Sequence, residues 1–257
     1  MNIKKQIIAL TTITKKEIIR ILRIWPQTLI PPVITTSLYF IIFGEILFKN
    51  KTITVSGQTV EYLHYLIPGL IVMAIINNSY TNTVSSFFIS KFHRNIEEVM
   101  FAPVPVPIII LGFALGGIAR GLMTALMIFV TAILFGATSI YSLSMLLATA
   151  FLTALFFSLA GIINAIFAKN FDETTWFPAF ILTPMTYLGG VFFSIDMLPN
   201  NWQVIAKLNP VYHFINIFRY SFIGVGEFSF MYLTAIICAN IIVFLLATLA
   251  FQKKMKK

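Results

Sequence analysis

The residues best suited to chemistry gather in the stretch KFHRNIEEVMFAPVPVPI, residues 91–108. Five ionisable side chains fall within eight residues there, at Lys91, His93, Arg94, Glu97 and Glu98. Only 11% of the chain is charged, and long apolar runs lie on both sides of this stretch. Acidic and basic groups placed so closely suit ion pairing with another protein. An ordinary solvated turn between two apolar segments is the alternative.

The same stretch predicts a short, stiff helix over residues 91–101, in which Asn95 also presents a polar side chain. Pro103, Pro105 and Pro107 forbid a regular helix after it and predict an extended exit, because proline fixes φ and lacks a backbone N–H. A flexible loop would favour Gly and Ser instead.

A second candidate is Arg120 in GGIARG, which lies about 20 Å of helix beyond the prolines at 1.5 Å per residue. An arginine at that depth of a bilayer costs at least about 2.5 kcal/mol and faces a partner or water. It could line a substrate path and attract anionic headgroups, or it could have a structural role at an interface. Gly116, Gly117 and Gly121 would let another helix approach closely.

A third candidate is the polar face of the apolar stretch 63–90. Asn78, Asn82 and Ser85 share this face through their i, i+4, i+7 spacing. Such a face could line a hydrophilic route, or it could form hydrogen bonds between helices worth about 0.6 kcal/mol each.

Motifs for catalysis or direct cofactor binding are not found in the sequence. The phosphate-binding pattern GxxxxGKS/T does not occur. His64, His93 and His213 lack the spacing of zinc ligands, and no pair of carboxylates suggests hydrolysis. We therefore expect no enzyme activity and no bound cofactor, so that any energy comes from a partner or from a gradient.

The elements that must position these residues follow from composition. The chain has 257 residues and is 58% hydrophobic, which leaves too few charges to cover a water-soluble domain. A bilayer span needs about 20 mainly apolar residues. Inside lipid the backbone N–H and C=O groups must bond to each other, which favours a helix. We predict an all-α integral membrane protein, one domain over 1–257, with six transmembrane helices at 28–48, 63–90, 107–136, 143–168, 175–193 and 229–251.

The distribution of Lys and Arg predicts the orientation of these spans. With both termini in the cytoplasm, thirteen of the eighteen basic residues lie on the inner side and four on the outer side. The net charge of +9 therefore marks cytoplasmic loops and lipid headgroups, and no nucleic-acid partner is expected.

Three segments outside the spans have their own predicted structure. Residues 3–23 have apolar residues at helical spacing among basic ones, which predicts an amphipathic helix on the inner membrane face; a poorly ordered basic tail is the alternative. Residues 194–228 are too polar to span the bilayer, which predicts short interfacial or re-entrant helices on its outer side. In the inner loop 169–174, Asp172 and Glu173 can cap the following helix.

The chain resembles the permeases of ABC-2-type transporters over essentially its whole length. Six spans, an amphipathic first helix and FAPVP after the charged loop all fit that family. A looser signature near the C-terminus also fits, with Val211 as a small departure after the proline. Its residues are Gly189, Val191, Leu198-Pro199, Asn209-Pro210, His213 and Arg219. Within the family the chain resembles the YadH-like permeases, near the nodulation-factor and polysaccharide exporters.

This resemblance implies a homodimer in the bacterial inner membrane that works with two separate ATPase subunits, which bind the ATP. The segment 91–101 would be the coupling helix docked in the ATPase, and Asp172 and Glu173 could lie near the same subunit. The residues 194–228 would cap the exit of an exporter for a lipid-linked, glycolipid or hydrophobic substrate. A secondary transporter is the alternative. Such a transporter would require intramembrane carboxylates and often repeated halves, and neither is evident in the sequence. A membrane scaffold for a partner protein is a further alternative.

Overall fold

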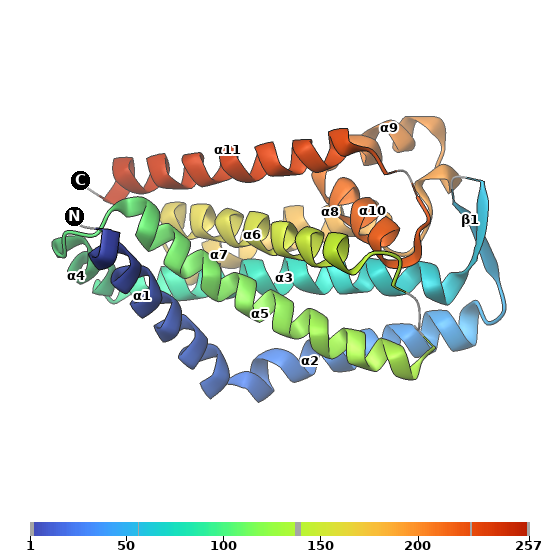
Figure 1. The fold of residues 1–257 in the computed structure, drawn as a ribbon, viewed down its shortest axis with the longest axis horizontal. Helices are drawn as coiled ribbons and strands as arrows, with labels where there is room; N and C mark the ends of the chain where they lie inside the picture. The colour runs from blue at the N-terminus through green and yellow to red at the C-terminus, as the bar shows by residue number, and fades with distance from the viewer. Residues whose placement is uncertain (1–2, 56, 137–139, 227, 256–257) are drawn as a thin grey trace.

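The computed structural model describes residues 3–55, 57–136, 140–226 and 228–255. Long helices lie side by side along one axis, and the two ends of the chain lie at the same end of the bundle (Figure 1). A β-hairpin lies at the opposite end (Figure 1). We call these the terminal end, which holds α4, and the hairpin end.

The elements follow one another along the chain as helices of very different lengths. The long helices are α1 (Ile3–Arg23), α2 (Trp25–Tyr39), α3 (Tyr62–Phe92), α5 (Val106–Leu134), α6 (Leu143–Phe167) and α11 (Phe230–Met255). The short ones are α4 (Asn95–Phe101), α7 (Phe171–Phe177), α8 (Thr183–Leu188), α9 (Asn200–Leu208) and α10 (Pro210–Ile223). π-helices continue α2 over Phe40–Leu47 and α7 over Pro178–Leu182, and Ile195–Met197 is a 3-10 turn.

The helix α3 forms the centre of the bundle, because α5, α6 and α10 all pack around it. Small residues allow these close contacts. A Cβ on Gly161 would lie 2.7 Å from the carbonyl oxygen of Tyr80, and a Cβ on Gly117 would lie 2.9 Å from that of Ser79. Glycine at such sites lets two helix backbones approach each other. The predicted role of the glycines around Arg120 in helix packing is therefore confirmed.

Five helical stretches of the described chain are long and apolar enough to cross a bilayer: Trp25–Leu47, Tyr62–Phe92, Val106–Leu134, Leu143–Phe167 and Phe230–Lys254. They correspond to the predicted spans 28–48, 63–90, 107–136, 143–168 and 229–251. The chain is therefore mostly helical with several candidate spans.

The predicted span 175–193 is not among these five. This part of the chain is helical over 171–188, but it begins with Asp172 and Glu173 and widens into a π-helix at Pro178. Proline lacks the N–H that a regular turn would use, which favours such an irregular turn. The sixth span stays a prediction.

The all-α prediction is wrong at the hairpin end. Strands β1 (Thr52–Val55) and β2 (Gln58–Glu61) pair antiparallel, with Thr52 opposite Glu61. Ile53 and Val55 are buried while their neighbours are exposed, the alternation expected of a strand with one covered face. Gly57 adopts a φ of +79° beside the turn, a conformation that favours glycine.

The helix α1 has the bounds expected from the sequence, but it packs obliquely along α5 (Figure 1). Gly112 and Gly116 of α5 face it, since an added Cβ would lie 2.6 Å from Ile13 and 2.6 Å from Glu17 respectively. Glu17 and Ile21 are buried as a result. The interfacial position of α1 stays a prediction.

Candidate functional site

The charged stretch forms an exposed knob at the terminal end of the bundle. The helix α3 ends at Phe92. Arg94 adopts a φ of +60°, which changes the direction of the chain before α4 begins at Asn95. The helix α4 therefore covers the last seven residues of the predicted helix 91–101, whereas Lys91 and Phe92 end α3 and His93 and Arg94 form the turn between the two helices. Ile96 is buried, whereas Glu97 and Glu98 are exposed.

The prolines after α4 serve two different purposes. Pro103 and Pro105 lie in extended chain, as expected, and Pro105 precedes α5 with a φ of −61°. Pro107 instead lies within the first turn of α5, so the prediction of an extended exit is wrong for this residue. Its missing N–H has no helical partner to lose there.

Lys91 does not belong to the exposed knob. Its Nζ donates to the carbonyl oxygens of Ala165, Ile166 and Ala168 at 3.2, 2.9 and 2.6 Å. These carbonyls end α6 and have no partners within that helix. The ammonium group supplies the missing hydrogen bonds, and its positive charge is stabilised by the negative end of the helix dipole. Lys91 thus joins α3 to α6, and its predicted place among the coupling residues is not supported by this geometry.

The second charged loop lies beside the first. The ring of Phe171, the first residue of α7, lies 4.9 Å from that of Phe88 and 5.4 Å from that of Phe92, centroid to centroid. Phe92 in turn contacts the ring of His93 at 5.5 Å. Two loops far apart in sequence therefore share one surface at the terminal end.

Within the second loop the two acidic residues differ. The Oε2 of Glu173 accepts from the backbone N–H of Lys169 at 2.8 Å, and the N–H of Glu173 donates to Asn170 Oδ1 at 2.8 Å. This reciprocal arrangement caps α7, as the sequence allowed. Asp172 is exposed on the shared surface.

A buried polar junction joins α1 to α3 next to α5. Oε2 of Glu17, a residue that is fully buried, accepts from Ser86 Oγ at 2.7 Å and from Arg20 Nη2 at 3.0 Å. The same guanidinium donates to Asn82 Oδ1 at 2.8 Å. We call Glu17, Arg20, Asn82 and Ser86 the α1 junction.

Arg120 lies half-buried on α5 next to this junction, close enough to Arg20 for their charges to repel each other. Within the part of the chain that the structure describes, its Nε has no hydrogen-bond partner, and neither do Glu17 Oε1 and Asn82 Nδ2. Buried polar atoms without partners are costly. The junction is therefore an incompletely satisfied cluster of charged and polar groups.

The three polar residues of the predicted α3 face separate in the structure. Asn82 belongs to the α1 junction, and Ser85 Oγ donates to its own helix at Thr81 O. Asn78 also bonds within α3, to Ala74 O at 3.0 Å, and lines a groove of about 280 Å³ between α2 and α3. Thr35 and Thr36 line the α2 side of that groove. We call it the α2–α3 groove.

The C-terminal signature builds a closed cluster at the hairpin end, centred on the buried Arg219 of α10. Its guanidinium carbon lies 3.8 Å from the centroid of the Tyr65 ring, and Nη2 donates to Gly190 O at 2.7 Å. The hydroxyl of Tyr65 donates to Gly190 O at 3.0 Å and to Phe193 O at 2.8 Å. We call Arg219, Tyr65 and the carbonyls of 190–193 the Arg219 cluster.

The other signature residues shape the chain around that cluster. A Cβ on Gly189 would lie 3.0 Å from Val211 and Ile215, which keeps α10 close to the end of α8. Leu198 and Pro199 precede α9, and Pro210 is the first residue of α10. His213 Nε2 contacts Lys207 O at 2.9 Å, from α10 to α9.

Sequence reasoning did not single out Glu17 or Tyr65. Glu17 is the only acidic residue in residues 1–44, and that isolation within a basic, apolar helix was an available signal. Tyr65 lies among other aromatic and apolar residues, and no local pattern marks it as the partner of an arginine 154 residues away.

Comparison with known proteins decides the family. Residues 8–223 match the family described as ABC-2 type transporter. The chain belongs to the ABC-2 type transporter family. Such permeases are transport subunits that work with an ABC ATPase, and they are not enzymes themselves.

Named relatives agree with this ABC-2 assignment. The chain is 44% identical over 239 residues to the inner membrane transport permease YadH of Escherichia coli, covering 93% of this chain and 92% of the relative. It is 26% identical over 203 residues to nodulation protein J of Rhizobium meliloti, covering 76% of each. The nodulation protein J of Bradyrhizobium diazoefficiens is 23% identical over 185 residues, 72% of this chain and 69% of the relative. The predicted resemblance to YadH-like permeases is confirmed.

Proposed function

We propose that this ABC-2 permease is the membrane subunit of an ATP-driven exporter in the bacterial inner membrane, acting as a homodimer on two separate ATPase subunits. Its substrate class would be a lipid-linked, glycolipid or otherwise hydrophobic molecule. The permease itself binds no cofactor in this proposal, and ATP is used by the partner. The name of the 44% identical relative supports the inner membrane location.

The observation that carries the proposal is the meeting of two charged loops on one surface. The knob of α4 presents Glu97 and Glu98, and the neighbouring loop presents Asp172. The buried Ile96 below and the Phe88, Phe92 and Phe171 rings beside it anchor this surface to α3 and α7. A push on α4 would therefore reach α3, the central helix of the bundle.

A sixth crossing is supported by two fixed contacts along α3. Lys91, near one end of α3, holds Ala168, and Tyr65, near the other end, holds Gly190. Lys91 follows Tyr65 by 26 positions along α3, a rise of about 39 Å of helix. The chain between Ala168 and Gly190 must therefore run the length of α3, which supports six crossings and both termini on the same, cytoplasmic side.

For the transport path we propose the α2–α3 groove. Its wall combines Asn77, Asn78, Thr35 and Thr36 with apolar residues, which suits a substrate with a polar head and an apolar tail. At its edge Tyr39 contacts the ring of Phe192 at 5.6 Å, next to the Arg219 cluster. In this proposal that cluster and the helices α9 and α10 close the outer end of the path.

The coupling role is tested by reversing charge on the knob. We expect Glu97→Lys with Glu98→Lys to weaken binding of the ABC ATPase about tenfold, since exposed charges set complementarity at an interface. Co-purification and ATP hydrolysis of the reconstituted complex would measure this. The matched control is Glu45→Lys, an exposed acidic residue in the π-helix Phe40–Leu47 that precedes the hairpin. Equal effects of both changes would contradict a docking site on α4.

The orientation is tested by labelling single cysteines in a Cys238→Ser background, since Cys238 is the one cysteine of the chain. Phe101→Cys, at an 89% exposed position of the knob, should react with an impermeant maleimide only after the cells are opened. Lys51→Cys at the hairpin end should react in intact cells. Labelling of Phe101→Cys in intact cells would overturn the proposed function.

A further inference from the structure

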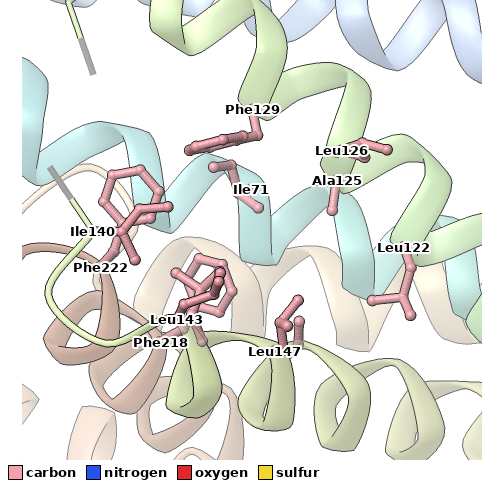
Figure 2. A pocket seen from close by; sticks show the side chains of 12 residues that line it. Ile71, Leu122, Ala125, Leu126, Phe129, Ile140, Leu143, Leu147, Phe218 and Phe222 are labelled. Carbon is pink, nitrogen blue, oxygen red and sulfur yellow. The ribbon is translucent and has the colours of Figure 1, made fainter. Parts of the chain in front are cut away.

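A second hollow of the molecule is wholly apolar and lies apart from the α2–α3 groove. It has a volume of about 330 Å³ and lies between α5, α6, α3 and α10 (Figure 2). Figure 2 shows Phe129 and Ala125 of α5 opposite Leu147 of α6, with Phe218 and Phe222 of α10 beside Leu143. The twelve described residues that line it are all apolar.

The hollow opens sideways between two membrane-spanning helices. Three of its lining residues are largely exposed: Leu126 of α5 at 63%, and Leu143 and Leu147 of α6 at 58% and 59%. Both α5 and α6 are among the candidate spans, so this opening faces the hydrocarbon of the bilayer. Water does not fill a cavity of this kind, because water needs polar partners. Apolar ligands do fill such cavities.

Polar groups are found just beyond the hairpin end of the hollow. Ile140 lines it, and the next residue, Tyr141, is 63% exposed. The Tyr141 ring lies 5.4 Å from that of Tyr220, and the backbone N–H of Tyr141 donates to Phe222 O at 3.0 Å. Tyrosines are favoured at the level of lipid headgroups, where one end of the side chain is apolar and the other is wet.

We propose that this hollow binds one acyl chain of a resident membrane phospholipid, with the headgroup beside Tyr141 and Tyr220. Its volume falls within the range of small-molecule sites, and its side opening admits a chain that remains attached to a lipid in the bilayer. An extended protein segment would bring backbone N–H and C=O groups that the apolar wall could not satisfy.

The site is separate from the proposed transport path. Ile71 faces the hollow, whereas Leu70, Ala74 and Asn77 line the α2–α3 groove, so the two lie on different faces of α3. The bound chain would contact Phe218 and Phe222, which flank Arg219 in α10. It would thereby hold α10 against α5 and α6 without taking part in transport.

Photo-crosslinking of the full-length permease tests this site. The protein is reconstituted in vesicles of phosphatidylethanolamine and phosphatidylglycerol in which an increasing fraction of the phosphatidylethanolamine carries a diazirine on one acyl chain. Peptide mapping should place saturable labelling on residues 122–129 and 143–150. The vesicles contain phospholipid as their sole source of acyl chains, so such labelling identifies phospholipid, and its absence would overturn the proposal.

Two matched variants separate a specific site from general lipid contact. Ala125→Phe should reduce labelling of these residues about tenfold, because the ring takes the volume that the chain needs. Ala235→Phe, on the exposed face of α11, should leave it unchanged. Labelling of the wild type that does not saturate and matches that of the exposed α11 residues would overturn the proposal. This measure needs no variant, so it decides the case even if Ala125→Phe fails to fold.

Discussion

Two buried arginine sites of this permease, the Arg219 cluster and the α1 junction, are built in opposite ways. Arg219 is 3% exposed, stacks on Tyr65 and donates to backbone carbonyls that do not ionise. Arg20 keeps 29% of its side chain exposed and pairs with the buried carboxylate of Glu17. Of these two sites, as the structure describes them, the α1 junction leaves buried polar atoms without hydrogen-bond partners, at Glu17 Oε1 and Asn82 Nδ2.

The difference shows which part of the molecule can rearrange. A buried polar network in which every group has a hydrogen-bond partner rigidifies its surroundings. A network that leaves some groups without partners stabilises its surroundings less. We therefore expect the hairpin end to keep its structure during transport and α1 to shift against α3 and α5. Movement of the coupling surface at the terminal end would then be accompanied by this shift of α1.

The largest effect should come from breaking the Arg219 cluster. Arg219→Ala leaves Gly190 O and the Tyr65 ring facing an empty buried site, so we expect a loss of about 3 kcal/mol in the free energy of unfolding. Thermal unfolding of the purified permease in detergent measures this loss. The matched control is Lys207→Ala on α9, which is exposed and should change stability by less than about 0.5 kcal/mol.

A smaller effect should come from pushing α1 away from α5. Gly116→Leu places side-chain atoms where Glu17 lies, since even a Cβ would come within 2.6 Å of it. We expect overpacking to cost about 2 kcal/mol and to free α1 from the bundle. Faster tryptic cleavage at Lys15 and Lys16 would report this release. Val130→Leu, at an exposed position of the same helix, should not change the cleavage rate.

The smallest effect should come from removing the charge of the α1 junction. Glu17→Gln keeps the shape of the side chain but loses the ion pair, and Arg20 is partly exposed, so we expect a loss of about 1 kcal/mol. Lys15→Gln, an exposed charge change on the same helix, is the control. If Glu17→Gln costs as much as Arg219→Ala, the contrast between a fixed hairpin end and a movable α1 is wrong.

Much of the fold could be predicted because its signals are local. Twenty apolar residues in a row must form a helix in lipid, and residues 3–23 have the periodicity of a helix on their own. The cap at Glu173 and the glycines at 116, 117 and 121 were also recognisable from their neighbours in sequence. Short elements without a strong period were harder, as the hairpin at Thr52–Glu61 and the irregular helix at 171–188 demonstrate.

The candidate sites could be predicted less well, because they depend on which distant residues meet. Lys91 has the same charge as its neighbours in the sequence, but only packing brings it to the end of α6, 74 residues later. Asn78, Asn82 and Ser85 share one helical face, but α1 covers Asn82 and leaves Asn78 in the groove.

The sequence by itself determined the family, the membrane setting, the main spans and the charged loop at 91–101, because composition, length and spacing act along the chain. Only the tertiary structure decided that Glu17 and Arg20 meet Asn82, that Arg219 meets Tyr65, and that an apolar hollow opens between α5 and α6. These contacts depend on the relative positions of whole helices, which follow from the packing of small residues such as Gly116 and Gly161 against distant partners.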